Sequence, residues 1–297
     1  MKKKIKFLAI FNSNAGNGGR LKLINNVIRL IKENHKIQLF KTQSEKSAKT
    51  VFKKISKKNF DRLIIVGGDG SMFFAINEMI KNNMVNKPVA FIPIGTANIL
   101  QIEAHIKINA NDIYCTLTSN KYKKINLTKI NKKYFFLMAG VGFDSNIVNS
   151  VNTNIKKYLG KFIFAYKFFQ NFLFLKNNII NIKINGKKIN ADWVLCTNSK
   201  YYAGPYSITK STNIFKHKII VYIFQNLTRT KLLYYIWLIL TKGDLSSAKS
   251  LIKKDLQSLQ INKIKRKLLS QVDGENFGYS DKLFISKTKK FINLLVS

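Results

Sequence analysis

The stretch IIVGGDGSMF, residues 64–73, sets three glycines around one aspartate between an apolar run and a helix-forming segment. The run DRLIIV (61–66) has almost no polar alternation, which predicts a strand buried on both faces, and MFFAINEMI (72–80) predicts a helix. Glycine lets the backbone approach a ligand closely, and the first amides of the following helix favour an anion. The turn is therefore a candidate phosphate-binding site.

The same strand, turn and helix order recurs on both sides of this stretch. Expected strands are KIKFLAIF (4–11), KIQLFKT (36–42) and PVAFIPI (88–94), and expected helices cover 18–34, 44–57 and 97–104. Continuous apolar strands between helices indicate a parallel sheet covered on both faces, and right-handed crossovers place all strand-to-helix turns at one edge. FNSNAGNGG (11–19) and IPIGTANIL (92–100) then lie beside the 67–71 turn, where open α/β sheets bind ligands.

Alternatives to a phosphate site exist for each part of this pattern. The sequence has no GxxxxGK[ST] loop and no GxGxxG after a strand, which argues against P-loop and dinucleotide-binding proteins. Gly67, Gly68 and Gly70 can also simply form a tight turn. Asp69 would repel a phosphate unless a Mg²⁺ ion bridges the two, because hard cations prefer carboxylate and phosphate oxygens. The alternative for Asp69 is a carboxylate that supports its own turn through backbone bonds.

After about residue 120 the pattern changes to short strands. These are KKINLTKI (123–130), KYFFLMAGVGF (133–143), IINIKI (179–184), KKINADWVLCTN (187–198) and KIIVYIF (218–224), with helices expected over 155–175 and 229–240. Asn185-Gly186 between two alternating segments predicts a hairpin. The sequence thus predicts an α/β domain with a parallel sheet over residues 1–125 and a β-rich antiparallel sandwich domain over 126–284, with a cleft between them.

Composition restricts the class of protein. Fifty-two Lys and Arg against 14 Asp and Glu give a net charge of +38, but Lys, Asn and Ile are spread along the whole chain, as compositional drift produces. A basic shell still attracts anionic lipid, so we expect a peripheral contact with an anionic membrane surface and no specific nucleic-acid partner.

Two cysteines exclude a disulfide framework, and the apolar segments 162–175 and 232–240 are too short or interrupted to span a bilayer. We expect a cytoplasmic protein that can lie peripherally at the inner membrane face, and those two segments would be core helices, an acyl site or a membrane contact.

The few acidic residues include three beside glycines in the second half. Asp144 lies in AGVGFDS (139–145), and Asp273 with Glu275 forms VDGEN (272–276). A carboxylate facing a nucleotide can deprotonate an acceptor hydroxyl, as kinase chemistry requires, so Asp273 is the candidate base and Glu275 would orient it or the acceptor. The alternative is a plain Asp-Gly hairpin at 273–274.

NSNAG, GGDGS, PIGTAN, GVGFD and DGE, in this order, resemble the diacylglycerol kinase catalytic-domain family, which includes bacterial lipid kinases and sphingosine kinases. The resemblance covers nearly the whole chain. It implies a two-domain fold, ATP and Mg²⁺ as cofactors, and transfer of the γ-phosphoryl group to the hydroxyl of diacylglycerol or a similar long-chain lipid. It also implies that the last residues, from about 285 to 297, return to the first domain.

The resemblance assigns roles to individual residues. Asp273 would act as base with Glu275 beside it, and Asp69 and Asp144 would belong to the metal and water network. The residues that would line the nucleotide site are Asn12, Gly16, Thr42, Gly67, Gly68, Asp69, Gly70, Ser71, Gly95, Thr96 and Asn98.

The sequence departs from the family pattern at some positions. Ser13 stands where Pro is frequent, Ser71 replaces Thr, and Phe74 stands where many members carry Glu. Lys216 and His217 stand where the family commonly has Asp-Gly at a structural Mg²⁺, which argues against that second metal site. Three alternatives stay open: an NAD kinase-like phosphotransferase, an inactive lipid-kinase relative, and a non-enzymatic RNA or membrane binder. The sequence is compatible with several acceptor lipids and with a monomer or a homodimer.

Overall fold

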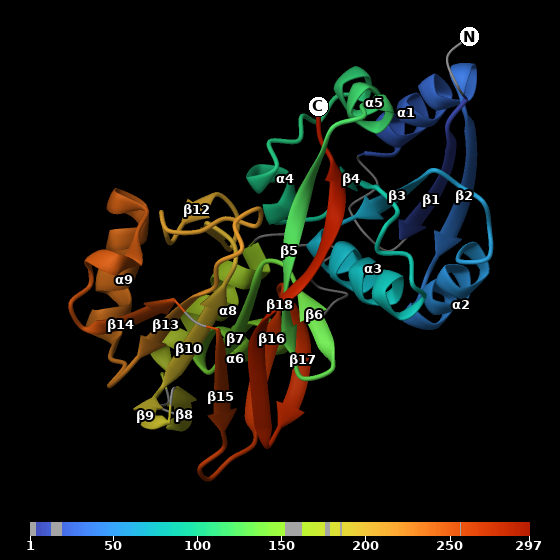
Figure 1. The fold of residues 1–297 in the computed structure, drawn as a ribbon. Helices are drawn as coiled ribbons and strands as arrows, with labels where there is room; N and C mark the ends of the chain where they lie inside the picture. Colours follow the sequence, from blue (N-terminus) through green and yellow to red (C-terminus); the bar gives the residue numbers. More distant parts are fainter. Residues whose placement is uncertain (1–3, 13–19, 152–161, 176–178, 185, 256) are drawn as a thin grey trace. The chain divides into compact units, whose positions relative to one another are not determined.

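The structure, a computed structural model, describes residues 4–12, 20–151, 162–175, 179–184, 186–255 and 257–297 (Figure 1). The chain forms two compact units. Unit 1 comprises residues 1–125 and 291–297, and unit 2 comprises residues 126–290.

Unit 1 is built on a parallel sheet with the strand order β2-β1-β3-β4. The last residues of β18 adjoin β4, with Leu294 opposite Val89. The elements of this unit are β1 (Lys6–Asn12), α1 (Leu21–Asn34), β2 (Lys36–Thr42), α2 (Glu45–Ile55), β3 (Arg62–Gly67), α3 (Asp69–Lys81), β4 (Val89–Pro93), α4 (Ile99–Glu103) and α5 (Ala110–Thr118).

Strands β1, β3 and β4 are buried along nearly their whole length because helices cover both faces of the sheet, whereas the edge strand β2 is largely exposed. Ile64 and Val66 of β3 belong to a core cluster with α1 and α5, while Leu63 and Ile65 point to the opposite face and are equally buried. Side chains alternate along a strand, so a run without polar residues requires two apolar faces. On the far side, α2 and α3 meet through Phe52 and Phe74, whose ring centroids lie 6.1 Å apart.

Unit 2 is β-rich and antiparallel. One sheet has the order β14-β13-β10-β7-β16-β17, and β18-β15-β8-β9 form a second ladder, in which β18 also pairs with the β5–β6 hairpin. The strands are β5 (Tyr122–Ile130), β6 (Lys133–Phe135), β7 (Met138–Val141), β8 (Ile180–Ile184), β9 (Lys187–Ala191), β10 (Trp193–Thr197), β11 (Tyr201–Tyr202), β12 (Tyr206–Ser207), β13 (Ile220–Phe224), β14 (Leu251–Asp255), β15 (Ser258–Asn262), β16 (Leu268–Val272), β17 (Glu275–Ser280) and β18 (Lys282–Leu295). The predicted fold class, an α/β domain with a parallel sheet and an antiparallel β-rich domain, is confirmed.

Three helices and one 3₁₀ turn of unit 2 lie within the described residues. They are α6 (Phe143–Ser150), α8 (Phe162–Leu173), α9 (Arg229–Lys242) and η1 (Leu245–Ser247). Helix α9 begins where the Thr228 side chain accepts the Lys231 N–H at 3.2 Å, and it ends at Gly243 in the left-handed region, φ +59°. Both ends follow the usual capping chemistry of helices.

Two segments predicted as single strands are divided in the structure. KYFFLMAGVGF breaks between β6 and β7 because the amides of residues 136–138 donate to the Asp273 carboxylate. Residues 187–198 break between β9 and β10 at Asp192, whose carboxylate accepts the Leu227 N–H at 2.9 Å. Helices α5 and α6 were not expected. Residues 155–161 of the expected 155–175 helix, and Asn185 of the hairpin, lie outside the described residues, while Ile184 pairs with Lys187 across that turn as predicted.

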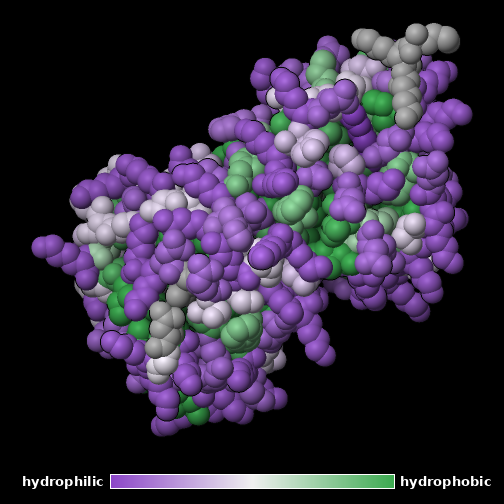
Figure 2. Space-filling view, in the orientation of Figure 1, coloured by the Kyte–Doolittle hydropathy of each residue, from purple (hydrophilic) through white to green (hydrophobic). Residues whose placement is uncertain are grey.

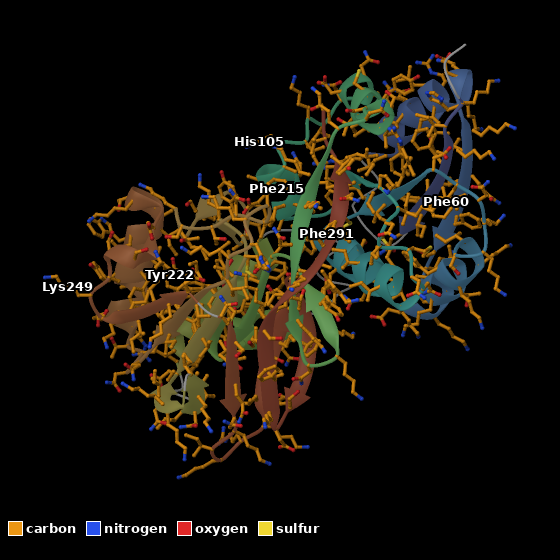
Figure 3. All side chains as sticks on the ribbon, in the orientation of Figure 1. Phe60, His105, Phe215, Tyr222, Lys249 and Phe291 are labelled. Atoms are coloured by element: carbon orange, nitrogen blue, oxygen red, sulfur yellow. The ribbon has the colours of Figure 1, made fainter. Side chains whose placement is uncertain are left out.

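Charged and polar residues dominate the surface on the face drawn in Figure 2, with separate hydrophobic areas between them. Several phenylalanines pack against the aliphatic part or charge of a lysine, as at Phe60 and Phe291 in Figure 3: Lys87 Nζ lies 4.8 Å from the Phe60 ring centroid, and Lys124 Nζ lies 4.4 Å from that of Phe291. In the described ranges, no helix has the length and apolar character needed to cross a bilayer.

Candidate functional site

The parallel sheet of unit 1 gathers most of the predicted nucleotide residues at one edge. Asn12, Thr42, Gly67 and Pro93 are the last residues of β1, β2, β3 and β4, and the strands run in the same direction. Residues 67–71 and 93–98, with Asn12, are called the strand-end turns below. Asn12 Nδ2 donates to Ser71 Oγ at 3.4 Å, so the end of β1 contacts the 67–71 turn. Gly16 lies outside the described residues.

Two of these turns pack glycine against glycine. A Cβ atom added to Gly95 would lie 2.6 Å from Gly68 Cα and 2.7 Å from Asn98 Oδ1, and one added to Gly68 would lie 3.1 Å from Gly95 Cα. Real Cβ atoms do not tolerate a contact of 2.6 Å with backbone, so position 95 requires glycine, whereas a Cβ atom at position 68 would force the Gly95 backbone to shift by a few tenths of an ångström. Gly67 is closed in a similar way, because its added Cβ would meet Ser71 Oγ at 2.3 Å.

Asp69 joins the same two turns through its carboxylate. Its Oδ2 accepts the Ile99 N–H at 2.8 Å and its Oδ1 accepts the Leu100 N–H at 3.1 Å, so it caps the start of α4. The structure shows that Asp69 supports the neighbouring turn, a role that the sequence did not indicate. Its role at Mg²⁺ stays a prediction.

Asn98 carries a buried polar atom that suggests a ligand. The residue is 4% exposed and adopts φ +47°, and its Nδ2 donates to Gly95 O at 2.8 Å. Among the described residues, none donates a hydrogen bond to Asn98 Oδ1. A buried acceptor without a donor is costly, about 1–3 kcal/mol, so a donor from a bound molecule would stabilise it. The glycine contact and this acceptor both fit a nucleotide at the strand-end turns.

Gly95→Ala tests this construction. We expect the new methyl group to push the 67–71 and 93–98 turns apart, to cost about 1–3 kcal/mol of unfolding free energy and to weaken Mg-ATP binding at least about tenfold. Isothermal calorimetry and urea denaturation measure the two effects. Gly204→Ala, at φ +120° with nothing within 4 Å of the added Cβ, is the matched control in unit 2. It should strain the backbone and leave nucleotide affinity unchanged; equal loss of affinity in both variants would contradict a site at the turns.

In unit 2, Asp273 occupies a two-residue turn and a buried acceptor position at once. Asp273 and Gly274 have φ of +49° and +77°, and Val272 pairs with Glu275, which is the hairpin considered as the alternative. The Asp273 carboxylate is nevertheless buried and accepts three backbone N–H groups, from Phe136 at 3.1 Å and from Leu137 and Met138 at 2.9 Å each. Such donors stabilise an ionised carboxylate, the form that a general base needs. Glu275 is half-buried directly after the turn.

Asp144 is the second buried acid of this unit, and Gln271 connects it with the Asp273 turn. Gln271 Nε2 donates to Asp144 Oδ2 at 2.9 Å, and Gln271 Oε1 accepts the Gly274 N–H at 3.0 Å. Burial raises the pKa of Asp144 to about 6, although hydrogen bonds from Gln271 and Ser145 oppose the shift. Gly140 must be glycine here, since an added Cβ would lie 1.9 Å from Asp144 Oδ2. A buried acid with a raised pKa is typical of functional sites.

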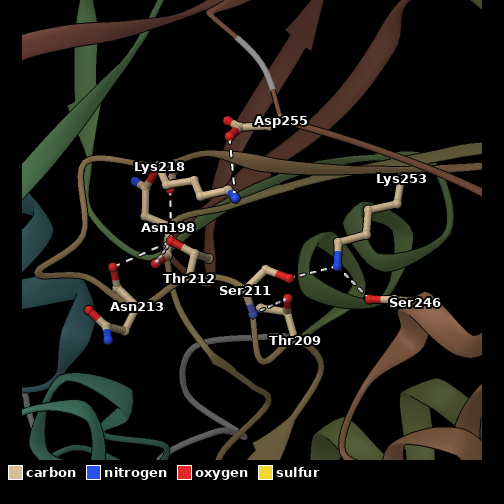
Figure 4. A network of polar contacts seen from close by, with 9 residues as sticks. All are labelled: Asn198, Thr209, Ser211, Thr212, Asn213, Lys218, Ser246, Lys253 and Asp255. Carbon is tan, nitrogen blue, oxygen red and sulfur yellow. Dashed lines mark hydrogen bonds and ion pairs between the residues drawn. The ribbon is translucent and has the colours of Figure 1, made fainter.

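The segment with Lys216 and His217 forms a turn closed by protein groups. Asn213 Oδ1 accepts the Phe215 N–H at 3.0 Å and the Lys216 N–H at 3.1 Å, and His217 Nε2 lies 2.7 Å from Thr288 O. Figure 4 shows the next contacts: Thr212 Oγ1 donates to Lys218 O at 2.8 Å, and Lys218 Nζ lies 3.4 Å from Asp255. These residues do not fit the structural Mg²⁺ of the resemblance.

Metal binding at the predicted acids would depend on other ligands. Within the described part of the chain, no group of three or more His, Cys, Asp or Glu side chains is arranged to hold a metal ion. A Mg²⁺ ion held by Asp69 or Asp144 would therefore take most of its six oxygen ligands from phosphate and water, as Mg²⁺ usually does with nucleotides.

Comparison with known proteins agrees with these motifs. Residues 6–130 match the diacylglycerol kinase catalytic domain. The predicted resemblance to this family is confirmed. Diacylglycerol kinase of Staphylococcus aureus strain JH9 is 24% identical over 173 residues, which cover 57% of this chain and 53% of that protein. Diacylglycerol kinase of Staphylococcus saprophyticus is 25% identical over 148 residues, 48% of this chain and 47% of that protein. The matched part thus spans about half the length of these diacylglycerol kinases.

A solved structure extends the likeness in fold. The crystal structure of a diacylglycerol kinase from Bacillus anthracis superposes with a TM-score of 0.80 and 19% identity, covering 100% of this chain and 99% of that one. At this identity the comparison shows the fold, including the β-rich domain beyond the diacylglycerol kinase catalytic-domain match.

The sequence indicated neither Gln271, which connects Asp144 with the Asp273 turn, nor the buried Asn198. Gln271 lies on β16, two residues before Asp273 in the turn, and its nearness to VDGEN (272–276) was the available signal. Asn198 is 3% exposed; its Oδ1 accepts from Thr128 Oγ1 at 2.8 Å, and the described residues provide no acceptor for its Nδ2. Nothing in the spacing of TNSKYY (197–202) distinguishes that asparagine.

Proposed function

We propose that this protein is an ATP-dependent lipid kinase that transfers the γ-phosphoryl group to the hydroxyl of diacylglycerol or a similar long-chain alcohol. The supporting observation is the close packing of the strand-end turns. Gly68 contacts Gly95, and Asp69 caps α4, within a segment that matches the diacylglycerol kinase catalytic domain.

The roles divide between the two units. In unit 1 the strand-end turns bind the triphosphate, because the first amides of α3 face an anion favourably. Asn98 Oδ1 accepts a hydrogen bond from a hydroxyl or amino group of the nucleoside, since phosphate oxygens only accept. Thr42 and Thr96 contact the nucleotide at the same edge. Asp69 in unit 1 and Asp144 in unit 2 are the acids that would belong to the metal and water network, and Mg²⁺ would supply positive charge against the phosphate charge that develops during transfer.

In unit 2 Asp273 takes the proton of the acceptor hydroxyl. The hydroxyl oxygen forms a bond to the γ-phosphorus while the bond from phosphorus to the β-phosphate oxygen breaks, and ADP departs with that electron pair. Three backbone amides orient the Asp273 carboxylate, and Gln271 accepts the Gly274 N–H of the adjacent turn.

The test is phosphate transfer from ATP labelled at the γ position. Purified protein with Mg²⁺ and dispersed diacylglycerol should give a labelled product that is extracted into chloroform, and omission of Mg²⁺ should abolish it. A parallel reaction with NAD as the acceptor tests the alternative of an NAD kinase-like phosphotransferase. Transfer to NAD alone would assign a soluble acceptor to the enzyme. Labelling of neither acceptor, with total membrane lipids also offered, would leave an inactive relative as the conclusion.

A further inference from the structure

Helix α9 of unit 2 exposes a continuous apolar stripe. Leu233, Tyr234, Trp237 and Leu240 follow the helical repeat, and Trp237 and Leu240 are 51% and 64% exposed. The opposite side of the helix is buried through Leu232, Tyr235 and Leu238. An exposed large hydrophobic residue is common, but four in one helical row form a surface that water solvates poorly.

Helix α8 carries a second stripe of the same kind. Phe162, Tyr166, Phe169 and Leu173 recur at intervals of four, three and four residues, and Phe162 is 81% exposed. Only Ile163 of this helix is fully buried among its described side chains. Two neighbouring segments in one unit therefore each present one aromatic face outward.

The two helices lie on the same side of one sheet. Trp193 of β10 and Phe224 of β13 are opposite each other and stack with ring centroids 3.9 Å apart, so both rings project from one face. Tyr235 of α9 packs on Phe224 at 5.2 Å, and Phe143 packs on both Trp193 and Phe168 of α8, at 5.7 Å each. The outer faces of α8 and α9 consequently point away from that sheet in the same general direction.

Arg229 fixes the ends of the two helices to each other. It is the first residue of α9, and its guanidinium donates to Phe172 O at 3.2 Å and Leu173 O at 2.5 Å, the last carbonyls of α8. A cation at a helix C-terminus also interacts favourably with the helix dipole. The two stripes are thus held as one surface, called the α8–α9 surface below.

The charge around this surface is positive. Helix α9 carries Arg229, Lys231 and Lys242 and no acid, and α8 carries Lys167 and no acid. Lys242 Nζ lies 5.8 Å from the Trp237 ring centroid, and Lys167 Nζ lies 5.7 Å from that of Tyr166. Aromatic side chains beside lysines are typical of helices that lie in the interface of an anionic bilayer, where the rings enter the headgroup region and the lysines meet lipid phosphates.

We propose that the α8–α9 surface docks the protein on an anionic lipid bilayer, with Trp237 and Leu240 of α9 and Phe162 and Phe169 of α8 entering the interface. The proposal names a membrane as the partner of the proposed kinase, because the acceptor lipid resides in a membrane. The biological role of the docking surface therefore rests on the proposed function. Docking itself requires neither nucleotide nor catalysis.

Vesicle binding tests the proposal with an internal reporter. The chain has two tryptophans, and Trp193 is buried while Trp237 is half-exposed, so a change in emission reports mainly on Trp237. Phosphatidylcholine vesicles with about one third phosphatidylglycerol should shift the emission to shorter wavelength and sediment the protein, and phosphatidylcholine alone should do so much less. Absence of both effects would overturn the proposal.

Substitutions identify the surface. Leu240→Ser and Phe169→Ser should each lower the vesicle partition coefficient about tenfold, because one large apolar side chain no longer enters the interface. Lys242→Glu should weaken binding to the vesicles that contain phosphatidylglycerol and leave binding to pure phosphatidylcholine vesicles unchanged. Ile264→Ser is the matched control, since Ile264 is an exposed apolar residue of unit 2 outside α8 and α9. Equal loss with Ile264→Ser would overturn the assignment, as would a dimer in gel filtration that Leu240→Ser dissociates without changing vesicle binding.

Two substrates separate this inference from the proposed function. Leu240→Ser should transfer phosphate to a short-chain, water-dispersed diacylglycerol at the wild-type rate and lose activity on long-chain diacylglycerol in anionic vesicles. Normal vesicle binding without any transfer would contradict the kinase function alone, whereas transfer without vesicle binding would contradict the docking surface alone.

Discussion

Asp273→Asn is expected to reduce phosphoryl transfer by about 10²- to 10⁴-fold, the range that a positioned general base contributes. The carboxylate that accepts the N–H groups of Phe136, Leu137 and Met138 is held in one orientation. Asparagine has nearly the same shape and cannot take the proton of a hydroxyl. Initial rates with γ-labelled ATP and dispersed diacylglycerol measure the loss.

The same substitution also affects stability, and this must be separated from the loss of the base. An asparagine amide group placed at the Oδ2 position would face the Phe136 N–H, donor against donor, so we expect a loss of about 1–3 kcal/mol in unfolding free energy. Urea denaturation quantifies this effect, and rates are compared at temperatures where both proteins are folded. Binding of Mg-ATP at unit 1, measured by calorimetry, should stay within about twofold of wild type.

Gly274→Ala is the matched control for the turn. Gly274 has φ +77° with open space around its Cα, so alanine strains the same hairpin by about 1 kcal/mol without touching the carboxylate. This variant should keep most of the transfer activity. If Asp273→Asn kept a tenth of the wild-type rate or more, or if Gly274→Ala lost as much, Asp273 would be a support of the 136–138 segment and not the base.

Local chemistry made the main elements predictable. The buried strand before GGDG, the amphipathic α1 and the Asn185-Gly186 hairpin follow from side-chain periodicity and glycine preference, which act within a few residues. Right-handed crossovers then place the strand-to-helix turns of unit 1 at one edge of the sheet. For the same reason, the gathering of Asn12, Thr42 and Gly67 at one edge could be predicted from sequence.

Long-range partners could not be predicted in this way. Asp69 bonds to amides of residues 99 and 100, and Asp273 bonds to amides more than 130 positions earlier in the chain. No spacing rule encodes which backbone N–H groups a carboxylate will meet once strands pair. The break between β6 and β7 was missed for this reason: KYFFLMAGVGF has the composition of one strand, and the Asp273 carboxylate competes with the sheet for three of its amides.

Asp144→Asn is expected to stabilise unit 2 at neutral and alkaline pH while it removes a carboxylate from the proposed site. The Asp144 side chain is buried, and burial raises its pKa from 3.8 to about 6 despite the hydrogen bond from Gln271. The shift means that the folded protein pays a free energy to keep this group charged. Asparagine has almost the same volume and can still accept from Gln271 Nε2, so it avoids that cost.

The sign of the pH dependence follows from proton linkage. Between pH 4 and 6 the folded protein holds a proton on Asp144 that the unfolded chain has released, so the wild-type unfolding free energy falls as the pH rises through this window. A shift of about two pKa units corresponds to about 3 kcal/mol, which is fully lost above pH 7. Asp144→Asn should therefore match wild type near pH 4 and exceed it by up to about 3 kcal/mol at pH 8.

Urea denaturation at pH 4, 6 and 8 in the presence of EDTA tests this, since chelation excludes any stabilisation of the charged form by a metal. Asp192→Asn is the control: Asp192 is also buried in unit 2, but its carboxylate caps the Leu227 N–H, so asparagine should gain no stability at pH 8. A variant at Asp144 that gains stability and loses transfer activity would show a charge retained for function at the expense of folding. Equal or lower stability of Asp144→Asn at pH 8 would mean that the buried carboxylate is compensated within the fold, and activity alone would then have to decide its role.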